Sequence, residues 1–72
     1  MKASVSKLAA GDRFLDSACG TFRRVERVYP DEGALWAVEV EGRDLPFFFL
    51  ADALVTIDKR TARRLYGAHS VN

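Results

Sequence analysis

The sequence predicts an all-β protein, a small and strongly bent antiparallel barrel of five strands that is followed by a short helix. Three observations support this fold class. Four of the five glycines are spaced 9, 13 and 9 residues apart, between apolar stretches, which is typical of short strands joined by turns. Apolar and polar residues alternate through the central stretches, and the spacing becomes helical only after Ile57.

Five strands are expected between these turns, at residues 12–16, 22–29, 35–41, 45–50 and 54–57. The second and third strands should form a hairpin, because the turn between them holds Pro30, which fixes φ, and Gly33, which accepts a positive φ. A second tight connection is expected around Gly42. The first seven residues are expected to be irregular, with Val5 and Leu8 plugging one end of the barrel.

Alternation assigns the faces of the central strands. One face of strand 35–41 is apolar and comprises Trp36, Val38 and Val40. The other face comprises Ala37, Glu39 and Glu41. In strand 22–29 the apolar residues Val25 and Val28 differ in parity, which predicts a bulge or bend. The expected core consists of Phe14, Val25, Val28, Trp36, Val38, Val40, Phe47, Phe49, Val55 and Ile57. Among these, Trp36 is expected to be the most costly to truncate.

A helix of about eight residues is expected after Ile57. Asp58 should cap its start and Gly67 should follow its end. Its apolar face comprises Ala62, Leu65 and Tyr66, and its basic face comprises Arg60, Arg63 and Arg64. A helix this short needs a docking surface to be stable. The chain is therefore divided into a barrel, residues 1–58, and a short basic helix with a loose tail, residues 59–72, docked on the barrel or partly flexible.

The run from Leu8 to Phe14, the central hairpin and the closing stretch FFLADALVTID resemble SH3-like small barrels. They are particularly similar to short uncharacterised proteins encoded by phages of high-GC actinobacteria, which often open with a Gly-Asp pair and end with an aromatic strand, an Asp-Ala turn and a further strand. The resemblance covers residues 5–58. It implies a small SH3-like barrel and an accessory role directed at a host protein.

The sequence contains no Gly-x-Ser-x-Gly elbow, Walker loop or Gly-x-Gly-x-x-Gly fingerprint. Cys19 and His69 are the only residues of their kind, which leaves no disulfide and too few ligands for a cysteine-based zinc site. They fall in a predicted loop and a predicted tail, with no third group to orient a nucleophile and its base. We therefore expect a protein that is not an enzyme and that binds no cofactor.

No apolar run approaches the roughly 20 residues that span a bilayer, and no signal peptide is visible. We therefore expect a soluble, cytoplasmic protein without a membrane partner.

The segment LPFFFL, residues 45–50, is apolar at every position. Alternation sends Leu45, Phe47 and Phe49 to one face and the remaining residues to the other: Pro46, Phe48 and Leu50. The outer face of such a sheet is normally polar, so this face needs a cover. The cover is either the C-terminal helix or a binding partner. Pro46 cannot donate to a ladder and marks a strand start or an edge strand, where a partner strand can add.

The leading functional prediction is a non-catalytic, protein-binding accessory module. Its contact residues are Pro46, Phe48, Leu50 and Tyr66. The expected partner is another protein, such as the host replication or transcription machinery, or a second copy of the chain in a homodimer. Residues 44–48 are also similar to the Gln-Leu-x-Leu-Phe peptide with which many bacterial proteins bind the replication sliding clamp, although the leading Gln is missing and the segment lies in a strand.

The alternative function is nucleic-acid binding. The net charge is only +1, but residues 1–58 carry −3 and the last fourteen residues carry +4. The basic residues of that final stretch, which could neutralise phosphates, are Lys59, Arg60, Arg63 and Arg64. Arg23, Arg24 and Arg27 would extend this surface, and Tyr29, Trp36 or Tyr66 would stack on bases. The other interpretation is a solvated helix face whose arginines pair with Asp52, Asp58 or the acids of residues 31–44.

Overall fold

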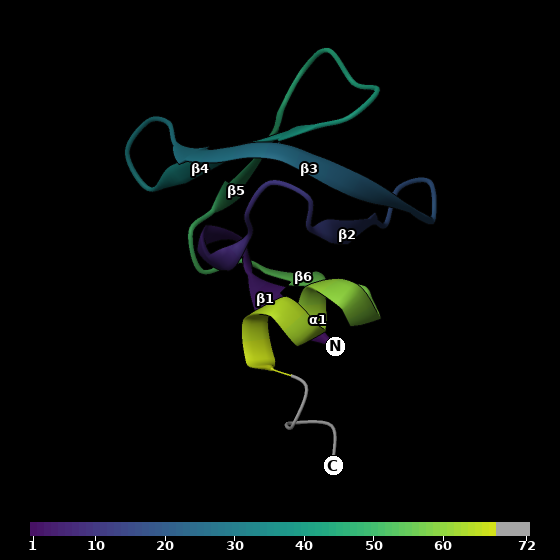
Figure 1. Ribbon diagram of the computed structural model, residues 1–72. Helices are drawn as coiled ribbons and strands as arrows, with labels where there is room; N and C mark the ends of the chain where they lie inside the picture. The colour runs from purple at the N-terminus through teal and green to yellow at the C-terminus, as the bar shows by residue number, and fades with distance from the viewer. Residues whose placement is uncertain (68–72) are drawn as a thin grey trace.

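The computed structural model describes residues 1–67 and shows a mostly β protein with one short C-terminal α-helix (Figure 1). Its elements, in chain order, are β1 (Lys2–Ser4), a 3₁₀ turn (Val5–Lys7), β2 (Arg13–Asp16), β3 (Thr21–Pro30), β4 (Leu35–Val40), β5 (Phe47–Leu50), β6 (Leu54–Thr56) and α1 (Lys59–Tyr66). All five predicted strands are present, with ends that differ by at most two residues. A sixth strand, β1, lies in the stretch that was expected to be irregular.

The strands form a curled antiparallel sheet, a half-barrel. β2, β3, β4 and β5 are hydrogen-bonded neighbours in that order, and β1 pairs with β6. An isolated bridge between Phe14 and Ile57 links the two sheets. Figure 1 shows β3 and β4 along one side of the molecule and α1 on the opposite side, beyond β1 and β6.

A bulge in β3 confirms the parity break that the sequence predicts. Val25 pairs with Val40, but the next pair is Arg27 with Glu39, so the register shifts by one residue between them. Because an extra residue in one strand reverses the alternation, Val25 on one side of the bulge and Val28 on the other both reach the core. The bulge also helps to bend so small a sheet.

The core contains all ten residues that the sequence assigned to it. Six are buried: Phe14, Val25, Val38, Val40, Val55 and Ile57. Four are half-buried and pack against them: Val28, Trp36, Phe47 and Phe49. Phe14 lies at the centre, with its ring edge-on to Phe47 and Phe49 at centroid distances of 5.5 and 6.0 Å. Val5 and Leu8 are buried as expected, and Ala3 of β1 adds a contact that was not predicted.

Helix α1 begins and ends as expected. The Asp58 carboxylate accepts a hydrogen bond of 2.9 Å from the Thr61 N–H, and Gly67 ends the helix with a φ of 81°. Ala62 and Leu65 pack against the core, so the helix is docked on the half-barrel. None of the helices formed by residues 1–67 combines the length and the apolar character that crossing a membrane requires. The predicted loose tail, with His69, lies outside the described residues.

Candidate functional site

The outer face of β4 and β5 carries an exposed apolar surface. Leu35 pairs with Leu50, and Ala37 pairs with Phe48, so these side chains share one face of the sheet. Phe48 and Leu50 are 52% and 53% exposed, and Leu35 is 39% exposed. We call Leu35, Phe48 and Leu50 the outer patch. The sequence left two candidates for covering this face, the C-terminal helix and a binding partner. The helix is excluded, because α1 docks beyond β1 and β6 (Figure 1).

A polar cluster borders the outer patch on β3 and β4. The Tyr29 hydroxyl donates a hydrogen bond of 2.9 Å to the Glu39 carboxylate, and this bond is the main reason that the pKa of Tyr29 is raised. The Arg27 guanidinium lies 4.7 Å from the Tyr29 ring centroid and 3.5 Å from the same carboxylate. Ala37 is fully buried between its cross-strand neighbours Tyr29 and Phe48. The outer face therefore joins an apolar patch to a charged rim.

Strand β5 lies at an edge of the sheet. It pairs with β4 and with no other strand among residues 1–67. The backbone N–H groups of the 3₁₀ turn bond to the chain just after β5, not to the strand itself: the Ser6 N–H donates to the Ala51 carbonyl and the Val5 N–H to the Ala53 carbonyl. Pro46 directly precedes the strand, in agreement with its predicted place at a strand start on an edge.

The structure brings together three of the four residues that were predicted to bind a protein. Pro46, Phe48 and Leu50 lie in or beside β5. Tyr66 does not join them, because it lies on α1 and its hydroxyl donates a hydrogen bond of 3.1 Å to the Lys2 carbonyl. The prediction missed Leu35, whose pairing with Leu50 is set by the register between β4 and β5.

The basic residues of α1 do not form one surface. Arg60 and Arg64 line a cavity of about 310 Å³, together with Arg13 of β2 and Arg24 of β3. Lys59 and Arg63 instead line a second cavity of about 410 Å³, beside Met1 and Ala62. Of the additional arginines considered, only Arg24 joins the first cavity, and none of the aromatic residues proposed for base stacking lines it.

An arginine of the helix does form an ion pair, but not with any of the acidic residues that the sequence suggested. Arg64 pairs with Asp12, which is buried, and not with Asp52, Asp58 or an acid of residues 31–44. This hydrogen-bonded pair raises the pKa of Arg64. Arg64 is therefore not a free surface base, and Asp12 is a site residue that charge counting did not single out.

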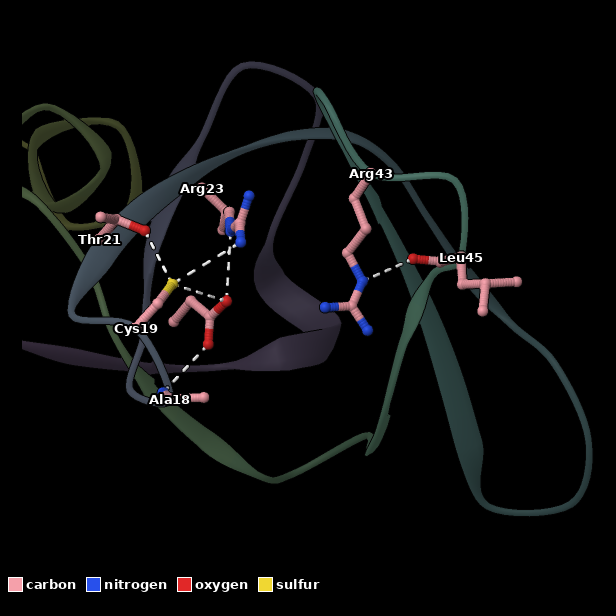
Figure 2. Close-up of polar contacts among 7 residues, drawn as sticks. Ala18, Cys19, Thr21, Arg23, Arg43 and Leu45 are labelled. Carbon is pink, nitrogen blue, oxygen red and sulfur yellow. Dashed lines mark hydrogen bonds and ion pairs between the residues drawn. The ribbon is translucent and has the colours of Figure 1, made fainter.

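A second polar cluster organises the turn between β2 and β3. The Asp16 carboxylate accepts hydrogen bonds from the Cys19 thiol at 3.2 Å, the Ala18 N–H at 3.1 Å and Arg23 Nε at 3.2 Å. The bond from Cys19, followed by those from Ala18 and Arg23, lowers the pKa of Asp16. Figure 2 shows Cys19, Thr21 and Arg23 pointing toward one another in this cluster. Cys19 thus stabilises the turn through its hydrogen bond to Asp16. Arg23 is engaged by the same carboxylate and does not extend the basic surface of α1.

Across the half-barrel from this turn, Arg43 stabilises the loop before β5 through two contacts. Its Nε donates a hydrogen bond of 2.9 Å to the Leu45 carbonyl (Figure 2), and its guanidinium lies 4.0 Å from the Phe47 ring centroid. Within residues 1–67, no three His, Cys, Asp or Glu side chains are grouped so that they could hold a metal ion.

Comparisons of the chain with protein families, with curated proteins and with solved structures find no match.

Proposed function

We propose that this protein is a small, non-catalytic protein-binding module with an SH3-like barrel, and that it binds its partner through the outer patch and the edge of β5. The observation that carries the proposal is the exposure of Phe48 and Leu50, both more than half accessible, on an edge strand. Clustered apolar side chains on the surface of a small protein often mark an interaction site. An edge strand adds unpaired backbone groups to which an extended segment can bind.

The chemistry of the partner follows from this arrangement. An extended segment that pairs with β5 would place alternate side chains against Phe48 and Leu50, because side chains alternate along a strand. Phe48 would supply the main anchor, since buried aromatic side chains dominate interface energies. Arg27 and Glu39 at the border of the patch would chiefly change the rate of association.

The curled sheet of short antiparallel strands supports the SH3-like assignment, together with the resemblance of residues 5–58. The same resemblance, to short phage proteins, supports an accessory role that acts on a host protein. A role as a sliding-clamp peptide has less support. Phe47 of that segment packs against Phe14 in the core and pairs with Val38, so residues 44–48 do not form a free peptide.

The alternative, nucleic-acid binding through Lys59, Arg60, Arg63 and Arg64, stays a prediction. Its support is reduced by the division of these residues between two cavities and by the pairing of Arg64 with Asp12. We therefore propose the outer patch as the contact surface for the protein partner.

An affinity capture with matched variants tests the proposal. The parent protein is compared with Phe48→Ser and with Phe22→Ser as baits in an actinobacterial lysate. Phe22 is the appropriate control because it is also about half exposed, at 47%, but lies on β3 opposite Leu15. We expect Phe48→Ser to lose the captured proteins and Phe22→Ser to retain them, with both variants folded by circular dichroism.

Recovery of the same proteins by all three baits would remove Phe48 from the binding surface. Sedimentation of the parent and of Phe48→Ser tests the homodimer, because loss of self-association in the variant would identify a second copy as the partner.

A further inference from the structure

Four arginines meet in the cavity between the β2–β3 ladder and the first turn of α1. The cavity measures about 310 Å³, and its polar lining comprises Arg13, Arg24, Arg60, Arg64, Asp12 and Thr61. We call it the arginine cavity. It shares no residue with the outer patch, so an inference about it does not depend on the proposed protein-binding function.

The positive charge of the arginine cavity is only partly neutralised. Among the described residues that line it, the one carboxylate is Asp12, which is already engaged by Arg64 through both oxygens. Arg24 is paired with Glu41, at 3.1 Å, in an exposed ion pair. Arg13 and Arg60 have no carboxylate partner within residues 1–67. Two arginines that lack a carboxylate partner among the described residues therefore line the same cavity.

The strand register forces two of these arginines together. Arg13 of β2 and Arg24 of β3 are directly paired across the antiparallel ladder. Like charges at directly opposite positions destabilise a sheet. A bound anion would offset the repulsion between Arg13 and Arg24. The pairing of these two arginines therefore costs stability in the free protein but favours the binding of an anion.

Buried contacts hold the cavity in shape without a ligand. Thr61 is buried, and its hydroxyl oxygen accepts a hydrogen bond of 2.8 Å from the Arg13 backbone N–H, which ties the first turn of α1 to β2. Arg64 is fixed by Asp12 and donates a further bond of 2.8 Å to the Lys7 carbonyl. Preformed sites of this kind lose less freedom when a ligand binds.

We propose that the arginine cavity binds a phosphate monoester in its dianionic form. Guanidinium groups match the oxygens of a phosphate through forked, charge-assisted hydrogen bonds. The two uncompensated charges of Arg13 and Arg60 match the two charges of a monoester, whereas each phosphodiester carries one. The volume lies at the lower end of the range for small-ligand sites, while nucleic-acid backbones usually follow extended grooves.

A titration with inorganic phosphate tests the proposal. Amide chemical shifts of the parent protein are followed by NMR at pH 7.5, with chloride used to keep the ionic strength constant. We expect saturable shifts at Gly11, Arg13 and Thr61, which border the cavity. Arg60→Gln and Arg13→Gln should each weaken phosphate binding by about tenfold or more, as expected for the loss of a charge-assisted hydrogen bond.

Arg63→Gln is the matched control. It removes the same charge from the same helix, but Arg63 lines the other cavity, so phosphate affinity should stay within about twofold of the parent. An equal loss in Arg63→Gln and Arg60→Gln would show non-specific attraction and overturn the proposal. Absence of saturable binding up to about 10 mM phosphate would also overturn it.

Two further measurements distinguish the ligand source and a folding defect. A 5′-phosphorylated oligothymidylate should bind more tightly than its 5′-hydroxyl counterpart, and equal affinity would assign the cavity to backbone phosphodiesters instead. In phosphate-free buffer at low salt, Arg13→Gln should be at least as stable as the parent, because it removes the repulsion from Arg24. A destabilised Arg13→Gln would show that Arg13 has a structural role and would contradict the argument from repulsion.

Discussion

The guanidinium of Arg64 forms a fork with the carboxylate of Asp12, although 52 positions separate the two residues in the sequence. Arg64 Nε lies 2.7 Å from Asp12 Oδ1, and Arg64 Nη2 lies 2.6 Å from Asp12 Oδ2. Asp12 is only 3% exposed, and its Oδ2 also accepts a bond from the Ala9 N–H. The pair fastens α1 to the turn before β2, so Arg64 acts as a structural residue on a helix face that the sequence presents as solvated.

Arg64→Gln should destabilise the protein by about 2–3 kcal/mol, less than the loss of a fully buried pair because the Arg64 side chain is partly exposed. The reason is that the buried Asp12 carboxylate would lose its counter-charge and two hydrogen bonds. Urea unfolding followed by circular dichroism measures the change.

Arg60→Gln serves as the control, since Arg60 lies on the same helix and has no carboxylate partner in the described part of the chain. Its effect should stay within about 0.5 kcal/mol. The Asp12→Asn and Arg64→Gln changes should be clearly non-additive when combined. Equal midpoints for Arg64→Gln and Arg60→Gln would show that the fork contributes nothing to stability.

Phe14→Ala should be the most destabilising truncation of an aromatic residue, at about 3–5 kcal/mol. The structure thereby changes the ranking suggested by the sequence, which favoured Trp36. Phe14 is buried and its ring packs edge-on against Phe47 and Phe49, whereas Trp36 is half-buried. Parallel urea titrations of Phe14→Ala and Trp36→Ala compare the two, and a larger loss for Trp36→Ala would contradict the ranking.

Asp16 should make stability depend on acidic pH. Its pKa is lowered in the folded protein, first by the Cys19 hydrogen bond, so the carboxylate stabilises the fold above its ordinary pKa of 3.8. This contribution is lost as the pH falls through the lower, folded pKa. Asp16→Asn should therefore melt at a lower temperature than the parent at pH 7, and the difference should shrink toward pH 2.

Thermal melts at both pH values test this, with Asp52→Asn as a control for the removal of an exposed acid. A difference between the parent and Asp16→Asn that stays constant from pH 7 to pH 2 would rule out the titration of Asp16 as its cause.

Ala37→Leu should destabilise the protein by about 1–3 kcal/mol, because the larger side chain has no space between Tyr29 and Phe48. Ala34→Leu is the matched control, since Ala34 is exposed in the turn before β4. If both variants unfold at the same denaturant concentration, Ala37 is not enclosed by its neighbours.

The regular part of the fold could be predicted because local signals are strong there. The alternation in β4 predicted its two faces, and the parity break in β3 predicted the bulge. Asp58 and Gly67 predicted where α1 begins and ends. β1 was missed because three residues, of which only Ala3 is buried, show no period. Its pairing with β6 depends on tertiary structure and leaves no local pattern.

The candidate sites were predictable only where they lie within one segment. The apolar run identified Phe48 and Leu50, but the contribution of Leu35 depends on strand register. The charge run identified Arg60, whereas the meeting of Arg13 with Arg24 and α1 depends on how three elements dock. Tyr66 was placed in the wrong surface because helical spacing shows which residues share a face, not which surface that face contacts.

The pairing of β1 with β6 affects how the chain folds during synthesis. Lys2 pairs with Thr56, and the Ile57 N–H donates to the Met1 carbonyl, so the first strand must wait until the last one has left the ribosome. The hairpin of β3 and β4 needs only a short loop to close, and can form much earlier. Nascent chains stalled before β6 should therefore contain this hairpin while Lys2–Ser4 remains open to proteases and chaperones.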